Sequence, residues 1–229
     1  GEIRVVQTEF AHGNCATAVE KHSEGAAWRN DPKTSGETFV LGDVGAHALH
    51  LATFITRQQV LEVAADRQSF VKGRILEDNA HVLLRFEQGA AGYLWASGVA
   101  IGHRHGLAIR VFGSKAGIEW HQERPNQLLF SPLGQTPRIL ELDSPELHPP
   151  AKRLLRVGAG HPEGYFEAFS NIYSDFAEVL LAKLSGETPD QLSLDFPTVE
   201  DGAHGVKFIE ACVESADNNG CWVNSKLDD

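Results

Sequence analysis

A series of six short apolar runs in the middle of the chain constrains the fold more than any other feature. The runs span residues 80–86, 91–99, 107–113, 117–122, 127–131 and 138–142. The links between them are short and rich in turn-forming residues, which suits antiparallel neighbours and leaves no room for the helical crossovers of a parallel sheet. The middle of the chain is therefore predicted to form one antiparallel sheet.

Some of these strands carry apolar side chains on both faces. The alternating positions are Val82, Leu83, Leu84 and Phe86 in one strand, and Tyr93, Leu94, Trp95 and Ala96 in the next. A sheet with two apolar faces needs two covers, because large apolar patches are rarely left in water. We expect helices to cover one face and a second copy of the chain to cover the other.

The remaining elements are predicted to surround this sheet. Residues 3–10 have the pattern of a first strand, residues 60–71 form a β-rich run, and residues 221–223 a short last strand. A Pro- and Gly-rich loop, residues 143–162, precedes a long helix. The apolar spacing of that helix predicts a core-facing stripe, made by Phe166, Phe169, Tyr173, Phe176, Leu180 and Leu184. A last helix covers residues 199–216, so the fold class is α+β.

The composition limits the classes of partner and the compartment. The chain has 229 residues, 42% of them hydrophobic, which is enough for one large domain, residues 1–229. Its formal net charge of −11 argues against nucleic-acid or anionic membrane partners. Three cysteines without C-x-x-C spacing indicate a reducing compartment. With no signal peptide and no membrane-spanning run, we expect a cytoplasmic location.

The start of the chain suggests that it is a piece of a longer protein. Met is absent from the whole sequence, and the chain opens directly into a strand-like run. No G-x-G-x-x-G, P-loop or G-x-S-x-G pattern is present, so the sequence shows no means of holding a nucleotide by itself.

The best chemical candidates lie on the helix predicted to begin at Asp43. At 100° per residue, Asp43, His47, His50 and Phe54 share one stripe. Asp43 and His47 are one turn apart, so the carboxylate could hydrogen-bond the imidazole and prepare it as a general base. In the alternative interpretation, Asp43 is only a helix N-cap and His47 a packed histidine. The pattern is short and leaves both interpretations open.

Other polar residues are weaker candidates. Trp28 could supply an apolar wall and Arg29 a clamp for a hydroxylated or anionic ligand, although an exposed salt-bridging arginine is more common. His103 and His105 fit a solvated turn better than a metal site. Asp43, His47 and His50 could instead bind a metal in a hydrolase, with a fourth ligand from His161 or Glu163. No metal site is assigned.

Several motifs together resemble one family, the C-terminal domain of glucose-fructose oxidoreductase, inositol dehydrogenase and MocA-like (Gfo/Idh/MocA) enzymes, over essentially the whole chain. The motifs are Gly1-Glu2-Ile3, Trp28-Arg29-x-Asp31-Pro32-x-x-Ser35-Gly36, Gly42-Asp43-x-Gly45-x-His47, Phe112-Gly113-Ser114-Lys115-Ala116-Gly117 and His161-Pro162-Glu163-Gly164-Tyr165.

The resemblance implies an open, mainly antiparallel sheet with helices on one face, like the C-terminal domain of glyceraldehyde-3-phosphate dehydrogenase. It implies a preceding Rossmann domain, with the dinucleotide fingerprint and an E-K-P motif, that is absent from this chain. NAD or NADP is the implied cofactor, which this chain would not bind alone. A sugar or cyclitol is the implied substrate, and homo-oligomers would form through the bare sheet face.

By the same resemblance, His47 would remove a proton from a substrate hydroxyl, and Asp43 would orient His47 or the substrate. Many relatives have Asp where this chain has His50, so the role of His50 stays open. The further substrate contacts are Trp28, Arg29, His50, His161 and Tyr165. The expected function is that of an NAD(P)-dependent sugar or polyol dehydrogenase, inactive as a fragment. The alternatives are an NAD-using glycoside hydrolase and a non-catalytic sugar-binding or regulatory protein.

Overall fold

A nine-stranded open sheet is the framework of the molecule. The computed structural model describes residues 1–142, 144–158 and 160–227. The strand order is β8-β7-β6-β5-β1-β4-β3-β2-β9, and every neighbouring pair is antiparallel except β1 and β4. The strands are β1 (Ile3–Ala11), β2 (Val60–Gln68), β3 (Asn79–Phe86), β4 (Ala91–Ser97), β5 (Leu107–Gly113), β6 (Ala116–His121), β7 (Gln127–Pro132), β8 (Arg138–Glu141) and β9 (Val223–Asn224).

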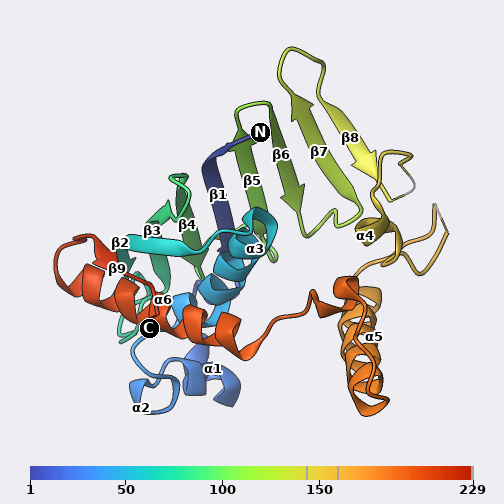
Figure 1. The fold of residues 1–229 in the computed structure, drawn as a ribbon. Helices are drawn as coiled ribbons and strands as arrows, with labels where there is room; N and C mark the ends of the chain where they lie inside the picture. Colours follow the sequence, from blue (N-terminus) through green and yellow to red (C-terminus); the bar gives the residue numbers. More distant parts are fainter. Residues whose placement is uncertain (143, 159, 228–229) are drawn as a thin grey trace.

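The helices lie on one face and at one end of this sheet (Figure 1). They are η1 (Val19–Lys21), α1 (Glu24–Arg29), α2 (Pro32–Ser35), η2 (Leu41–Gly45), α3 (Ala46–Thr56), α4 (Pro149–Lys152), α5 (Tyr165–Leu184), η3 (Gln191–Leu194) and α6 (Val199–Asp217). The predicted α+β fold, an open and mainly antiparallel sheet with helices on one face, is confirmed.

The hydrophobic core lies between the sheet and two helices. Helix α3 packs on β1, β4 and β5, and α6 packs on β2. The strand residues that face these helices are fully buried, as the two-residue period requires; among them are Val6, Val82, Leu84, Leu94 and Ile109. The hydroxyl of Thr8 in β1 also donates to the carbonyl of Ala48 in α3 at 3.0 Å. This packing fixes α3 against the middle of the sheet.

The opposite sheet face is open in this chain. Its apolar residues include Leu83, Phe112 and Ile139, which are 55%, 42% and 56% exposed. Charged pairs interrupt them, such as Arg85 with Glu62 at 2.8 Å. The face is therefore mixed rather than uniformly apolar, and the predicted partner on it stays a prediction.

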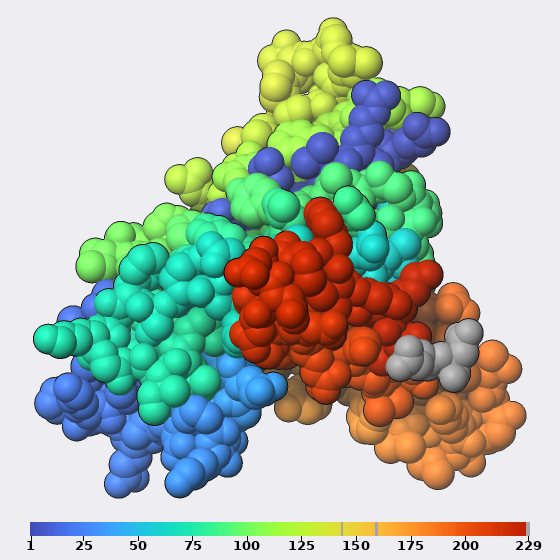
Figure 2. Space-filling model, turned by 90° about the vertical axis from the view of Figure 1, so that its left-hand side faces the viewer, coloured from blue at the N-terminus to red at the C-terminus, as the bar shows by residue number. Residues whose placement is uncertain are grey.

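Helix α5 contradicts its prediction. Its apolar stripe does not face the core: Phe166, Tyr173 and Leu184 are 81%, 70% and 76% exposed. The helix stands apart from the sheet, joined to η3 and to the α4 region (Figure 1), and Figure 2 shows it as an orange mass at the lower right, beyond the red α6. The spacing of apolar residues indicates that a helix face is apolar, but it does not specify what covers that face.

Three smaller differences concern element boundaries. The β-rich run predicted for residues 60–71 ends as β2 at Gln68. The loop predicted for residues 143–162 contains the short helix α4, and its positions 143 and 159 lie outside the described residues. The helix predicted to begin at Asp43 begins earlier, in a π-helical turn.

Within the described part of the chain, no helix is both long and apolar enough to cross a membrane.

Candidate active site

A cavity of about 880 Å³ lies where α3, the end of β1 and the start of α5 come together. Helical residues Asp43, Val44 and His47 line one wall, and His12, Asn14 and His105 from loops at the sheet edge lie beside them. Tyr165, Phe169 and Asn171 of α5 form the far wall. Concave sites of this kind, apolar with a few convergent polar groups, typically bind small molecules.

A π-helical turn presents Asp43 to this cavity. In η2 the N–H of Ala46 donates to the carbonyl of Leu41, five residues earlier, instead of four as in an α-helix. The turn packs against β4 at Gly45, where an added Cβ would lie in van der Waals contact with the Cβ of Ala96, at 3.5 Å. Single π-turns are frequent at functional sites.

Asp43 and His47 share the cavity but do not pair as predicted. Among the hydrogen bonds of the described residues, none joins the Asp43 carboxylate to the His47 imidazole. The π-turn has more residues per turn than an α-helix, so side chains four apart no longer stack directly. Oδ2 of Asp43 instead lies 3.6 Å from Nε of Arg29, and the His47 ring packs at 5.8 Å from that of Phe10.

The sequence interpretation missed His12 and Asn14. The N–H of Asn14 donates to Nδ1 of His12 at 3.3 Å, and both residues line the cavity. Burial lowers the pKa of His12; the Asp43 carboxylate opposes this shift and the neighbouring His105 adds to it. The signal in the sequence was the position of both residues in the loop directly after strand β1, because polar residues in loops that follow a strand often belong to binding or catalytic sites.

His105 lies in a solvent-exposed turn and also lines the cavity. It is exposed in the loop between β4 and β5, as predicted for a solvated turn. Its ring also lies 4.7 Å from the ring of Phe10 and lines the cavity. The loop assignment is confirmed, while the pattern gave no indication of the contact with the site.

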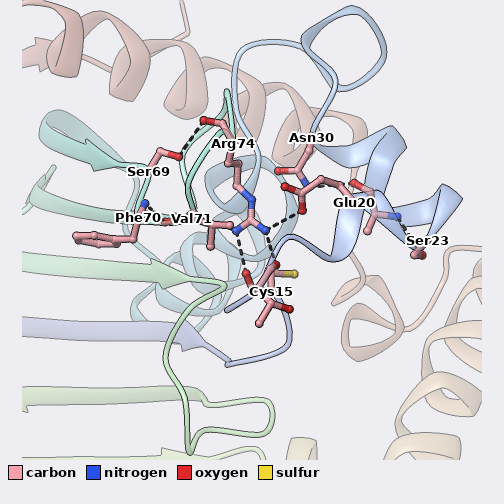
Figure 3. Close-up of polar contacts among 11 residues, drawn as sticks. Cys15, Glu20, Ser23, Asn30, Ser69, Phe70, Val71 and Arg74 are labelled. Carbon is pink, nitrogen blue, oxygen red and sulfur yellow. Dashed lines mark hydrogen bonds and ion pairs between the residues drawn. The ribbon is translucent and has the colours of Figure 1, made fainter.

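Arg74 holds the loop that carries Asn14 (Figure 3). Its fully buried guanidinium donates to the carbonyls of Cys15 and Thr17, each at 2.9 Å, and pairs with Glu20 at 2.8 Å and Asp78 at 3.1 Å. A buried charge is tolerated only when it is paired and hydrogen-bonded in this way. The arrangement fixes the backbone immediately after Asn14.

His50 belongs to another cavity. This smaller space of about 290 Å³ is lined by His50, Phe54, Arg57, Asp195 and Asp201, between α3 and the start of α6. Three residues along an α-helix turn the side chain by about 60° from His47, which is enough to direct it to a different neighbour. The predicted stripe therefore divides between two cavities.

Of the other predicted substrate contacts, Tyr165 lines the main cavity, whereas Trp28, Arg29 and His161 do not. Arg29 reaches the site through Asp43, and its guanidinium carbon lies 5.5 Å from the centre of the Trp28 ring, which is itself 54% exposed. His161 is exposed, with Nδ1 at 3.1 Å from the carbonyl of Gly158. Trp28 and His161 are not among the lining residues of the cavity in the described part of the chain.

The metal interpretation gains no support from the donor positions. Among residues 1–142, 144–158 and 160–227, no group of three or more His, Cys, Asp or Glu side chains is placed to hold a metal ion. The three residues proposed as ligands, Asp43, His47 and His50, do not converge. The site offers three imidazoles, a carboxylate and an amide in a largely apolar cavity; they belong to His12, His47, His105, Asp43 and Asn14.

Known proteins resemble the chain along its whole length. The family model for the GFO/IDH/MocA C-terminal domain matches residues 1–119. The uncharacterized oxidoreductase YfiI of Bacillus subtilis (strain 168) is 41% identical over 229 residues, which are 99% of this chain and 58% of that protein. The chain thus spans little more than half the length of this relative.

Two solved structures of an inositol dehydrogenase homologue from Azotobacter vinelandii are also similar. The complex with NAD+ has a TM-score of 0.91 and 45% identity, covering 98% of this chain and 58% of that one. The complex with NADH and myo-inositol has a TM-score of 0.86 and 44% identity, covering 98% and 57%.

Proposed function

Because the chain belongs to the Gfo/Idh/MocA family of oxidoreductases, we propose that it is the substrate-binding domain of a dehydrogenase that oxidises a hydroxyl group of a sugar or polyol. The observation that carries the proposal is the gathering of Asp43, His47, His12 and Asn14 at one end of a single cavity. The A. vinelandii homologue complexed with NADH and myo-inositol makes a cyclitol the first substrate to test.

The proposed dehydrogenation breaks one C–H bond and one O–H bond of the substrate. An imidazole nitrogen of His47 accepts the hydroxyl proton as the carbonyl forms. The hydride that leaves the same carbon would be accepted by a nicotinamide dinucleotide when one is bound. Asp43 and Arg29 are 3.6 Å apart, and their charged groups would orient the substrate hydroxyls next to the imidazole of His47. Tyr165 would contribute an aromatic wall.

The chain itself fits the substrate half of this reaction. It has no G-x-G-x-x-G sequence, so the dinucleotide would be held mainly by a preceding Rossmann domain that we propose for the complete protein. The fragment alone would then bind substrate weakly and turn none over. NAD and NADP are both compatible with these residues, since the groups that separate them lie in the Rossmann domain.

The test compares two histidines of α3 in the complete protein. His47→Ala is expected to lower kcat/KM with inositol and NAD about 10²- to 10⁴-fold, the usual contribution of a general base. His50→Ala, in the other cavity, is the matched control and should stay within about threefold of wild type. Wild-type activity in the His47 variant would refute the proposal.

The same assays separate the alternative functions. Release of free sugar from a glycoside without net NADH accumulation would identify an NAD-using hydrolase. Binding of inositol or sugar without any turnover would identify a non-catalytic sugar-binding or regulatory protein. In either case the role of His47 as a dehydrogenase base would be abandoned.

A further inference from the structure

A buried carboxylate in the link between β2 and β3 supports the turn that carries Asp43. This carboxylate belongs to Glu77, which is 5% exposed. Its neighbours Arg74 and Asp78 pair with each other, but the closest cation to Glu77 is Arg67, 4.0 Å away. A buried carboxylate without a close counter-charge needs hydrogen-bond donors. The site already described makes no use of Glu77.

The donors are backbone N–H groups at the beginning of the helical run. Oε1 of Glu77 accepts from the N–H of Phe39 at 2.9 Å and from the N–H of Leu41 at 3.0 Å. The first N–H groups of a helix have no partner within it and point outward with a partial positive charge. Glu77 therefore caps the run formed by η2 and α3 from a different part of the chain. Burial raises the pKa of Glu77, and the Leu41 and Phe39 N–H groups oppose that shift.

The cap is close to Asp43 and distant from the other anchors of the run. The N–H of Asp43 donates to the carbonyl of Phe39 at 2.9 Å, so Asp43 follows any movement of the residue that Glu77 holds. Beyond Asp43, the run is fixed independently by the bond from Thr8 to the carbonyl of Ala48, next to His47. Loss of the cap would consequently move Asp43 more than His47.

We propose that Glu77 is a positioning residue that sets the place of Asp43 in the cavity through the Phe39 and Leu41 amides. The proposal deepens, and rests on, the proposed function of Asp43 in substrate orientation. It has a structural part, the hold on the turn, and a functional part, the action through Asp43. Both parts are measurable.

The structural part is tested by amide hydrogen exchange in the complete protein. Glu77→Ala should speed exchange at Phe39 and Leu41, with no change at positions in the sheet such as Leu94. Glu77→Gln keeps a carbonyl oxygen for the two N–H groups, and its NH₂ would replace Oε2, which has no hydrogen-bond partner among the described residues and lies 4.0 Å from Nη1 of Arg67. Exchange at Phe39 and Leu41 should therefore be slower in Glu77→Gln than in Glu77→Ala. Unchanged exchange in Glu77→Ala overturns the proposal, whether or not the enzyme shows activity.

The functional part is tested by kinetics. Glu77→Ala should lower kcat/KM about 10- to 100-fold, as displacements of about 1 Å do, while Glu77→Gln retains most activity. Combined with Asp43→Asn, Glu77→Ala should add less than threefold to the loss caused by Asp43→Asn alone, because both variants remove the same contribution. If the two losses multiply, Glu77 does not act through Asp43 and the proposal is wrong.

Two controls separate this result from simpler explanations. Val63→Ala, fully buried in β2, should destabilise the fold without lowering kcat/KM; an equal loss of kcat/KM there would assign the Glu77 effect to general destabilisation and overturn the proposal. A wild-type protein without dehydrogenase activity would refute the proposed function, and the exchange data would then decide alone whether Glu77 holds the turn.

Discussion

The charge of individual residues in the cavity depends on neighbours that are far apart in the sequence. Burial lowers the pKa of His12 and the carboxylate of Asp43 opposes this shift. Asp43→Asn removes the opposing charge, so the pKa of His12 should fall further below 6.5. An NMR titration of ring-labelled histidines in both proteins measures the change. An unchanged or higher pKa of His12 in the variant would contradict the coupling.

The same residue makes stability depend on pH. Because the folded pKa of His12 lies below its ordinary value of 6.5, the unfolded chain binds the proton more readily. Its contribution to stability is therefore complete above pH 6.5 and is lost as the pH falls through the folded pKa. His12→Gln should lose less stability than wild type between pH 7 and about 5 in urea unfolding experiments. Parallel pH profiles of the two proteins would show that His12 is not the responsible group.

Residue-scale prediction from the sequence succeeded where one motif contained the information. The run G-D-x-G-x-H placed Asp43 and His47 on adjacent turns, and both reach the same cavity. His12 was not recognised because only the packing of β1 against α3 brings it beside Asp43 and His47. The hydrogen bond from Thr8 to the carbonyl of Ala48 is part of that packing. Likewise, the pairing of Asp43 with Arg29 depends on the π-turn, which residue spacing does not encode.

At the scale of elements, α5 and α6 show how one apolar pattern leads to two environments. Phe208 of α6 is 1% exposed against the sheet, whereas Phe166 of α5 is 81% exposed. Phe208→Ala should cost about 3–5 kcal/mol of unfolding free energy, and Phe166→Ala should change it by less than about 0.5 kcal/mol. Urea unfolding of this 229-residue chain measures both. A large loss for Phe166→Ala would mean that α5 is covered.

The strands were predictable because their signals are local. Alternation of apolar residues and short turns placed β3 to β8 within about two residues of their ends. The π-turn was not predictable in the same way. Its neighbours come from distant parts of the chain: the N–H of Leu41 donates to Glu77, 36 residues later, and Gly45 packs beside Ala96. A local sequence pattern does not record contacts of this kind.

At the scale of the whole molecule, sheet order was the least predictable feature. The predicted meander is confirmed for the pair of β3 and β4 and for the pairs from β5 to β8. It is wrong for β4 and β5, because β1 inserts between them and runs parallel to β4. Nothing local in residues 3–10 specifies that insertion, because it is decided by which buried surface the strand completes. Its consequence is functional, since it brings His12 at the end of β1 beside α3.

Two exposed apolar surfaces remain, the open sheet face and the stripe of α5, and they predict different assemblies. We propose that copies of the chain associate through the open sheet face. Leu83 and Phe112 are 55% and 42% exposed on this face, and the double variant Leu83→Arg, Phe112→Arg replaces both with charged side chains. Burying unpaired charges is costly, so the dissociation constant should rise about tenfold or more. Light scattering after size-exclusion chromatography at several concentrations measures it.

Phe166→Arg is the control for this assignment, because it places a charge of the same kind on the α5 stripe. If the sheet face is the interface, Phe166→Arg leaves the oligomer mass unchanged and only the double variant dissociates. If Phe166→Arg alone gives monomers, the interface lies on α5, and the bare sheet face has no role in assembly. The proposal rests on the exposed apolar residues Leu83 and Phe112 of this face, since the centre of an interface between folded subunits is apolar and charged pairs such as Arg85 with Glu62 belong to its rim.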